Sequence, residues 1–521
     1  MDLLHYWFSN KKNWFNCDTS FDIEIINLYG DLINYDILIK QKDIIINTNS
    51  NNYIKILETI LICDQLTRHK YRDNKSELQR YDNISFELSN YVINKTELLD
   101  MYNPYEKCFV LMPLRHSNTI KNNSELLDII KDIRMKTPDI TIYNRFYRAT
   151  LLRLGKLKNN ISITNKADIN DDISINQINT ILDKRSHLLE EVSNTKPLLE
   201  YIENLTDGYI DIINKLENKN YTISISGGVD SMLATFIMSL LKDKYNLKLN
   251  AIHINYNNRD TSYLEAELCI RWCKILNIDI YVRKIDEIKR QRDKDRDIYE
   301  DVTRFIRLNM YELAKSNIIL GHNKDDAIEN IFSNIIKSKN YENLYGMEKI
   351  QKNICRPMLN ITKKEIYNYA NQFNIPYVYD STPSWSERGK KRDILFPFLN
   401  NFDSRLIDGM YNLSQYVLDM NSVYDDYIDN CINYECEKGN IKNNNIISVI
   451  KTKNKKYNLW LSILSKICKN FELAYVSHKS IKNFIKIINN ENYKGSKIFL
   501  SNNLYCIYDK KDKYEIYYKK A

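Results

Sequence analysis

The stretch that decides the fold is YTISISGGVDSM, residues 221–232. Its first part, from Tyr221 to Ile225, is rich in β-branched and aromatic residues and predicts a buried strand. An apolar run with helical spacing follows from Met232 to Leu241. We therefore expect a strand that ends in a glycine turn and passes directly into a helix.

The turn between this strand and this helix has the composition of a phosphate-binding loop. Gly227 and Gly228 let the backbone turn sharply and bring its N–H groups close to an anion. The helix that follows adds unsatisfied N–H donors and the positive end of its dipole. Ser226 and Ser231 supply hydroxyl groups, and Asp230 is suited to hold a metal ion bound to the phosphates. No G-x-x-x-x-G-K-[ST] segment occurs in the chain, so this is not a Walker A loop.

The hexapeptide SGGVDS resembles the pyrophosphate loop (PP-loop) of the N-type ATP pyrophosphatases, which split ATP into AMP and pyrophosphate while they adenylate a substrate. The resemblance implies that ATP binds to the loop residues, which are Ser226, Gly227, Gly228, Val229, Asp230 and Ser231. It also implies a catalytic role for Asp230, as the residue that holds Mg2+. The alternative is a turn that only connects a strand to a helix, but the elements expected on both sides favour phosphate binding.

Length and composition describe a soluble protein of several domains. The chain has 521 residues, of which 43% are hydrophobic and 27% charged, so two to four domains are expected. Its net charge of +8 permits a polyanionic partner without requiring one. The ten cysteines include no C-x-x-C pair, which disfavours a zinc ribbon or an iron–sulfur site. Because no apolar run approaches about 18 residues, we expect a cytoplasmic protein without a membrane segment.

Residues 1–155 carry apolar residues at helical spacing and predict an all-α domain. Three clusters in this region resemble a helical domain of unknown function with a tetratricopeptide-like fold. They are HYWFSNKKNWF from His5, CDQLTR from Cys63 and MPLRHS from Met112. Within the first cluster, Trp7, Phe8, Trp14 and Phe15 are expected in the hydrophobic core.

The same clusters contain candidates for a site that binds a small anion. Asp64 and Arg68 have the i, i+4 spacing of an ordinary helix ion pair, so a structural role is the simpler interpretation. If the domain does bind an anion, Asp64, Arg68, Arg72 and His116 are the residues at which we expect it first.

Residues 156–204 predict a linker and a connecting helix, because the segment from 156 to about 180 is polar and weakly patterned. We therefore expect the helical domain to fold separately and to be dispensable for adenylation. Residues 205–400 alternate short apolar runs with helical stretches. This alternation predicts a doubly wound, parallel α/β sheet with its ligand at the carboxyl ends of the strands.

Polar clusters follow later strands of this sheet and resemble the tRNA(Ile)-lysidine synthetases and their thiolating relatives. In that family an H-x-N-H segment and a G-H-H-x-D-D-x-x-E-T segment surround the nucleotide. The resemblance implies nucleotide-binding roles for His253, Asn255, Gly321 and His322. It implies that Asp325 or Asp326 is catalytic and orients or deprotonates the incoming nucleophile. Contacts to tRNA or to the adenylate are implied for Arg304, Arg307, Arg388 and Arg392.

Simpler roles remain open for several of these residues. Asp325 and Asp326 also suit the first turn of a helix, where carboxylates are favourable. Arg304 and Arg307 lie three residues apart and also suit one exposed helix face. The basic cluster that contains Arg388 and Arg392 also suits an exposed charged turn.

The chain departs from the lysidine pattern at several positions around the same site. Tyr256 stands in place of the second histidine, and Asn323 replaces the histidine before the paired aspartates. Asn330 replaces a threonine, and Pro383 and Gly389 replace asparagines. These departures leave ATP use intact and put the nucleophile and the modified base in doubt.

We predict a multidomain protein with an all-α N-terminal domain, a central doubly wound parallel α/β domain and a small α+β appendage at residues 401–521. The resemblance implies an ATP-dependent carbon–nitrogen ligase that adenylates a tRNA base before an amine nucleophile displaces AMP. Its cofactors are ATP and Mg2+, and its partners are tRNA and an amino acid or sulfur donor. The alternatives are tRNA thiolation, which the absence of C-x-x-C pairs disfavours, and a non-catalytic tRNA-binding adaptor. The basic, tyrosine-rich C-terminal tail suits a nucleic acid and a solvated edge sheet equally.

Overall fold

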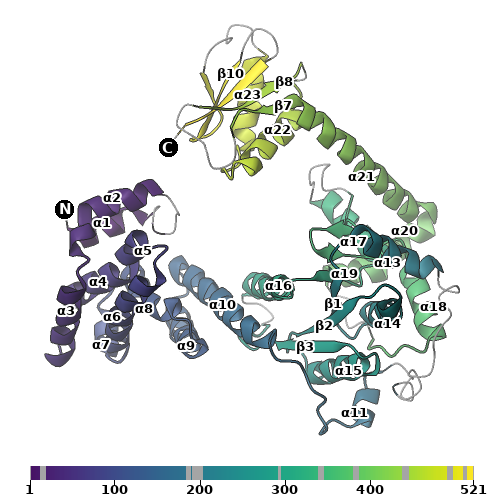
Figure 1. Cartoon of the computed structure of the whole chain (residues 1–521), viewed down its shortest axis with the longest axis horizontal. Coiled ribbons are helices and arrows are strands. Elements are labelled where there is room, and N and C mark those ends of the chain that lie inside the picture. The colour runs from purple at the N-terminus through teal and green to yellow at the C-terminus, as the bar shows by residue number, and fades with distance from the viewer. Residues whose placement is uncertain are drawn as a thin grey trace. The chain divides into compact units, whose positions relative to one another are not determined.

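The protein is described by a computed structural model of the whole chain (Figure 1). The residues that the structure describes are 2–11, 14, 19–182, 189, 203–290, 295–337, 345–379, 386–436, 445–453, 455–489, 497–508 and 513–519. The chain forms two compact units, Met1–Lys324 with Lys349–Ser381 and Asp325–Glu348 with Thr382–Ala521. Each unit is described by itself.

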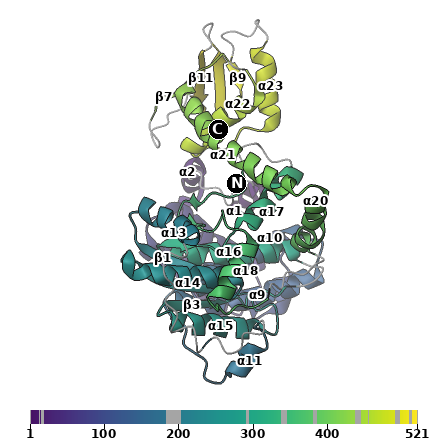
Figure 2. The same ribbon diagram turned by 90° about the vertical axis from the view of Figure 1, so that its right-hand side faces the viewer.

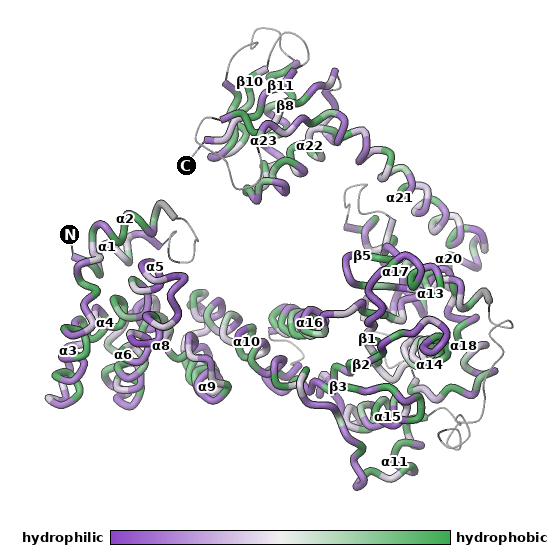
Figure 3. The backbone as a smooth tube through the Cα atoms, in the orientation of Figure 1, coloured by the Kyte–Doolittle hydropathy of each residue, from purple (hydrophilic) through white to green (hydrophobic). Residues whose placement is uncertain are grey.

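The N-terminal part of the first unit consists of helices, as predicted. They are α1 (Leu3–Ser9), α2 (Thr19–Tyr29), α3 (Tyr35–Asn47), α4 (Tyr53–Leu61), α5 (Thr67–Lys70), α6 (Lys75–Ile93), α7 (Thr96–Asp100), α8 (Pro104–His116), α9 (Ile120–Lys136) and α10 (Thr141–Ser162). Five of them begin after a side chain that accepts a hydrogen bond from the first turn, at Asn34, Asn52, Asn74, Asn103 and Thr119. Hydrophobic and hydrophilic residues alternate along these helices, as expected where one face is buried (Figure 3).

Aromatic rings hold the beginning of the chain to this helical core. Trp7 and Trp14 are buried and meet Phe109 edge-on, with ring centroids 5.7 and 4.8 Å away. Phe8 packs on the same ring at 5.7 Å. The prediction that these residues are structural is confirmed for all three, while Phe15 lies outside the described residues.

The second part of the first unit is built on a six-stranded sheet in the order β3-β2-β1-β4-β6-β5. The strands are β1 (Asn220–Ile225), β2 (Lys248–Asn255), β3 (Asp279–Lys284), β4 (Asn317–Ile319), β5 (Ile350–Gln351) and β6 (Ile354–Cys355). All neighbouring pairs are parallel except β5 with β6, so the predicted parallel α/β sheet is confirmed. Its helices in this unit are α13 (Glu203–Lys215), α14 (Val229–Lys244), α15 (Ser262–Ile275), α16 (Arg296–Leu313) and α18 (Lys363–Gln372).

The two faces of the sheet belong to different cores, because side chains alternate along a strand. On β2, Leu249 and Ala251 pack in the core that contains α14 and α15. Ile252 and Ile254 point the other way and join the core of the N-terminal helices and α16. Helices α10 and α16 lie together on that second face (Figure 1).

Helix α10 is the element that joins the helical domain to the sheet. A Cβ atom at Gly155 would lie 2.8 Å from Ile306 of α16, so only glycine allows this close approach. The buried amide of Asn159 donates to the carbonyl of Ile306 at 2.9 Å and accepts from Arg283 Nε of β3 at 2.7 Å. The expected boundary at residue 155 therefore falls inside a helix. The helical domain shares one hydrophobic core with the sheet, and its separate folding stays a prediction.

The segment after α10 also lies against the sheet, although its sequence predicts a linker. Ala167 N–H donates to the carbonyl of Ile280 at 2.8 Å, along β3. Arg271 of α15 donates to the carbonyl of Ile173 at 2.7 Å. A polar composition hid this docking, because the segment makes these two bonds through its own backbone. The short helix α11 (Ile175–Asn179) follows, and most of the remaining expected connection, up to residue 202, lies outside the described residues.

The second unit contains helices and an antiparallel sheet, and the predicted α+β class is confirmed (Figure 2). Its helices include α17 (Lys324–Ile336), α19 (Glu387–Lys390), α20 (Phe396–Phe402), α21 (Arg405–Cys431), α22 (Tyr457–Asn470) and α23 (His478–Ile488). Its five strands, in the order β7-β8-β11-β10-β9, are β7 (Ile432–Tyr434), β8 (Ile446–Lys451), β9 (Lys497–Phe499), β10 (Leu504–Tyr508) and β11 (Lys513–Tyr518). The sequence analysis missed β7 and β8. No described helix of either unit is long and apolar enough to cross a membrane.

Candidate active site

The predicted phosphate loop lies between β1 and α14, where the sequence places it. Gly227 has a φ of 86°, in the left-handed region that favours glycine. Its carbonyl accepts a hydrogen bond of 2.9 Å from Val378 N–H, which ties the loop to a distant segment. Gly228 is the N-cap of α14, so the loop leads into the positive end of the helix dipole.

The two serines of the loop have different environments. Ser231 is buried, and its hydroxyl accepts from Ser226 N–H at 3.0 Å and donates to the carbonyl of Gly228 at 3.0 Å. The hydroxyl of Ser226 lies 3.1 Å from that of Ser231, and residue 226 is exposed. Ser231 therefore shapes the loop from inside, while Ser226 offers its hydroxyl at the surface.

The end of β4 approaches the loop closely. A Cβ atom at Gly321 would lie 3.0 Å from the backbone of Asp230 and Ser231, so a larger residue would push the two segments apart. Asn323, two residues later, is fully buried and donates from Nδ2 to Asp230 Oδ1 at 2.9 Å. The residue that replaces a histidine of the family pattern thus positions the loop carboxylate.

A lysine that the sequence analysis did not single out contacts the same carboxylate. Lys363 Nζ lies 2.5 Å from Asp230 Oδ2, and both side chains are partly exposed. Lys363 is the first residue of α18, which begins with a capping box formed by Thr362 and Glu365. A cation in the first turn of a helix is unfavourable, because it opposes the helix dipole. The carboxylate of Asp230 offsets this cost.

His253 and Asn255 end β2 beside the loop strand. His253 is buried, and its Nδ1 lies 2.9 Å from the carbonyl of Ile225, to which we assign it as donor. Burial lowers the pKa of His253 to about 4, so the imidazole is neutral near pH 7. Asn255 donates to the carbonyl of Ser262 at 3.2 Å and accepts from Asn257 N–H at 2.8 Å. Both residues hold local backbone, and their nucleotide-binding roles stay predictions.

Two of the arginines expected to contact tRNA or the adenylate, Arg304 and Arg307, lie in the first unit and differ in exposure. Arg304 is exposed on α16. Arg307 is half-buried one turn later and donates to the hydroxyl of Tyr256 at 3.3 Å. The tyrosine that replaces the second histidine of the family pattern therefore has a cationic partner. On β4's other flank, Arg356 Nε donates to Nδ1 of His322 at 3.2 Å.

The remaining candidates form an ion-pair cluster inside the second unit. Arg388 Nε lies 2.9 Å from Glu329, and Arg392 Nη2 lies 3.2 Å from Asp326. Arg388 also pairs with Asp326, and Arg392 with Glu329. Both carboxylates are nearly buried, whereas Arg388 is half exposed. Asp325 lies in the first turn of the same helix, α17.

A sequence model of the PP-loop domain matches residues 202–394. Together with the glycine loop between β1 and α14, this match decides the identity of the central region. Residues 202–394 are a PP-loop domain. A second model, of a bacterial protein of unknown function (DUF924), matches residues 3–162.

Several curated relatives of the PP-loop domain are tRNA(Ile)-lysidine synthases. The one from Thermotoga maritima is 24% identical over 204 residues, which cover 38% of this chain and 49% of the relative. The one from Clostridium tetani is 31% identical over 212 residues, covering 38% and 44%, and the one from Chlamydia muridarum is 30% identical over 194 residues, covering 35% and 58%. The chain thus spans about half the length of these relatives.

Two solved structures have partial similarity to this chain. The U34-tRNA thiolase NcsA from Methanococcus maripaludis has a TM-score of 0.34 and 17% identity, over 42% of this chain and 80% of that one. An NH3-dependent NAD synthetase from Campylobacter jejuni has a TM-score of 0.27 and 16% identity, over 44% and 96%.

Two residues of the PP-loop region escaped the sequence analysis for different reasons. Glu329 occupies the glutamate position of the G-H-H-x-D-D-x-x-E-T pattern, so that pattern was a sufficient signal. Lys363 lies 133 positions from its partner Asp230, in an ordinary capped helix start. The sequence shows where that helix begins, but it does not show which loop the helix faces.

Proposed function

We propose that this protein is an ATP-dependent tRNA-modifying enzyme that adenylates a tRNA base, releases pyrophosphate and lets a nucleophile displace AMP. The observation that carries the proposal is the anchored carboxylate of Asp230 in the PP-loop, held by Asn323 at 2.9 Å and by Lys363 at 2.5 Å. The names of the curated relatives supply the substrate class. Because its substrate is tRNA, we also propose that the protein acts in the cytoplasm.

The loop is suited to hold the triphosphate. Gly227 and Gly228 bring backbone N–H groups to the carboxyl end of β1, and α14 adds its dipole. Lys363 adds a positive charge beside the loop. As the α-phosphate is attacked, negative charge grows on the leaving pyrophosphate, and fixed donors of this kind stabilise it.

Asp230 fits the proposed Mg2+ in its donor type. Mg2+ commonly takes one or two protein carboxylates and completes its shell with phosphate oxygens and water. Each oxygen of Asp230 accepts one hydrogen bond, and a carboxylate has room for further partners. Bound Mg2+ would neutralise phosphate charge, and Asn323 and Lys363 would keep the carboxylate in place.

The nucleophile is the part of the reaction in which this chain departs from the lysidine synthases. We propose an amino acid or a sulfur donor that attacks a base activated through its oxygen, with a product that need not be lysidine. Asp326 binds two guanidinium groups, and we assign the orientation of the nucleophile to Asp325 or Asp326. In this proposal Arg388 and Arg392 position the carboxylates of Asp326 and Glu329. Contact with tRNA is then not their sole role.

Mass spectrometry of nucleosides tests the function directly. The full chain is incubated with tRNA, ATP and Mg2+, and with radiolabelled lysine or a sulfur donor in parallel reactions. We expect an AMP-linked tRNA intermediate and label from one donor in the product. Lysine transfer to a cytidine would assign the lysidine reaction, sulfur transfer would assign thiolation, and no AMP-linked tRNA under any condition would refute the proposal.

A further inference from the structure

A cleft in the N-terminal helical domain has no role in the reaction proposed above. Its volume is about 670 Å3, within the range of small-molecule sites. Helices α5, α6, α8 and α10 contribute to its wall. The charged residues that line it are Arg68, Arg72, Lys75, Asp82 and Arg153, with His116 beside them.

The floor of this region carries a buried carboxylate. The chain widens into one π-helical turn at Ile62–Leu66, between α4 and α5, and Asp64 lies in that turn. The side chain of Asp64 is 1% exposed. Such turns interrupt regular helices most often at functional sites, and a buried charge persists only with partners.

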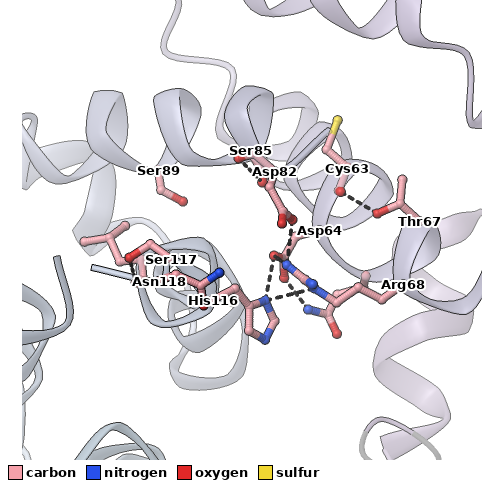
Figure 4. A network of polar contacts seen from close by, with 12 residues as sticks. Cys63, Asp64, Thr67, Arg68, Asp82, Ser85, Ser89, His116, Ser117 and Asn118 are labelled. Atoms are coloured by element: carbon pink, nitrogen blue, oxygen red, sulfur yellow. Dashed lines mark hydrogen bonds and ion pairs between the residues drawn. The ribbon is translucent and has the colours of Figure 1, made fainter. Parts of the chain in front are cut away.

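Asp64 has three such partners, Gln65, His116 and Arg68, and Figure 4 shows the last two converging on it. His116 Nδ1 lies 2.7 Å from Asp64 Oδ1, and Arg68 Nη2 lies 3.3 Å from the same oxygen. Burial alone would raise the pKa of Asp64, but the attraction to His116 and Arg68 outweighs it and lowers that pKa to about 2. Arg68 Nε lies 3.1 Å from the same Nδ1. We assign the Nδ1 proton to the shorter contact, with Asp64, so Nε2 of His116 is an acceptor.

Arg153 of α10 is attracted by Asp82 of the same cleft but makes no close ion pair with it. Its Nη2 donates to the carbonyl of His116 at 3.0 Å and to Asn118 Oδ1 at 2.8 Å. Its Nε is buried without a hydrogen-bond partner, and no carboxylate of the described residues lies within the 4.0 Å of an ion pair. The side chain of Arg153 lines the cleft, so its guanidinium is a candidate contact for an anion there.

Positive charge exceeds negative charge around the cleft. Burial lowers the pKa of Arg115; Asp64 opposes this shift, while Arg153 and Arg68 strengthen it by repulsion. Asp82 is the one carboxylate among the described lining residues, and burial raises its pKa to about 6. A bound anionic ligand would offset this excess of positive charge.

We propose that this cleft binds the phosphate group of a small molecule, with Arg153 and Lys75 as direct contacts. Arg68, fixed by Asp64, completes the anion-binding wall. A tetrahedral phosphate offers several acceptor oxygens to donors that come from different helices, whereas a carboxylate offers two in one plane. Leu78, Phe86 and Pro113 form an apolar wall for the rest of the ligand.

A purely structural network accounts for only part of these observations. It explains Arg68, which bridges Asp64 and Asp82, and it explains Arg72, which pairs with Asp22 at 2.7 Å. It does not explain the buried Nε of Arg153.

The test is equilibrium dialysis of the full chain against radiolabelled inorganic phosphate, with and without Lys363→Gln, which removes the positive charge beside the PP-loop. Arg153→Gln is compared with Arg145→Gln, which removes one charge from an exposed position of the same helix. We expect Arg153→Gln to raise the Kd at least tenfold in both backgrounds and Arg145→Gln to leave it within twofold. Equal Kd values for the two variants would overturn the proposal.

A second variant covers the case in which Arg153→Gln does not fold. Lys75 is exposed at the start of α6, so Lys75→Gln retains the core and should still raise the Kd severalfold. AMP and a ten-nucleotide RNA are then used as competitors. Displacement by AMP identifies a small phosphomonoester as the ligand, whereas displacement by the RNA alone would show a nucleic-acid surface and refute the small-molecule site.

Discussion

The ammonium group of Lys363 lies 2.5 Å from the carboxylate of Asp230, although 133 positions separate the two residues. Lys363 opens α18, and Asp230 lies in the first turn of α14. The pair thus joins the N-terminal ends of two helices at the phosphate loop. Both side chains are partly exposed, so the pair contributes little to stability. Its value is the position of a positive charge beside the proposed triphosphate.

Replacing Lys363 with glutamine should slow tRNA-stimulated release of pyrophosphate by about 100-fold, the usual effect of removing one electrostatic donor. The reason is the loss of a charge that faces the growing negative charge on pyrophosphate. The matched control is Lys364→Gln, which removes the next, exposed lysine of the same helix and should keep the rate. Equal rates in the two variants would remove Lys363 from the site.

Asp230→Ala should abolish pyrophosphate release and leave the fold intact. The Asp230 side chain is 23% exposed and its contacts are polar, to Asn323 and Lys363, so no apolar packing is lost. Far-UV circular dichroism and the thermal midpoint are the controls for folding. Pyrophosphate release at the normal rate in this variant would contradict the assignment of the loop.

His253 should make the folded chain less stable as the pH is lowered from about 6.5 to about 4. Its pKa is lowered to about 4 in the folded chain, while an unfolded histidine titrates near about 6.5. The unfolded state therefore binds more protons in this window, and the folded state loses up to about 3 kcal/mol as the pH falls through it. Above about pH 6.5 the histidine is neutral in both states and has no effect.

The His253→Asn variant isolates that contribution. Its Nδ2 takes the place of Nδ1 as donor to the carbonyl of Ile225, and it does not titrate. Chemical unfolding at several pH values should show a shallower decline for this variant than for the native chain. Identical slopes between pH 6.5 and 4 would show that burial does not hold the imidazole neutral.

Gly155→Val should destabilise the first unit by about 1–3 kcal/mol, the usual cost of overpacking a core. The new side chain meets Ile306, which is fully buried and has no room to move. Hydrogen exchange should accelerate in α10 and α16. The control is Gly409→Val in α21, where nothing lies within 4 Å of the new Cβ and only a small change is expected.

The same packing changes what truncation should do. A chain that begins after Ser162 would expose Ile306, Met310 and Ile254, which the N-terminal helices cover. We therefore expect poor solubility, instead of the independent PP-loop domain that the polar segment after residue 156 suggests. A soluble, folded fragment in size-exclusion chromatography would restore the view of two separate domains.

Local conformation around the phosphate loop follows from the amino-acid sequence. The run at 221–232 predicts a strand, a glycine turn and a helix, and β1, Gly227 and α14 follow that order. The sequence pattern was sufficient to predict these elements, because the preferences of residues for strand, turn or helix act locally. It failed for β7 and β8, which are short and depend on pairing with β11 and with each other. Strand pairing is a non-local property that a short apolar run does not reveal.

The amino-acid sequence alone specifies the PP-loop, the alternation of strands and helices around it and the helical character of the N-terminal region. These follow from backbone preferences and from the spacing of apolar residues, which act over a few positions. Tertiary packing was needed to show that α10 seals the sheet, that Lys363 and Asn323 hold Asp230, and that Arg153 faces a cleft without a carboxylate partner among the described residues. Each of these contacts depends on residues far apart in the chain, and only the packing of the core brings their side chains within reach.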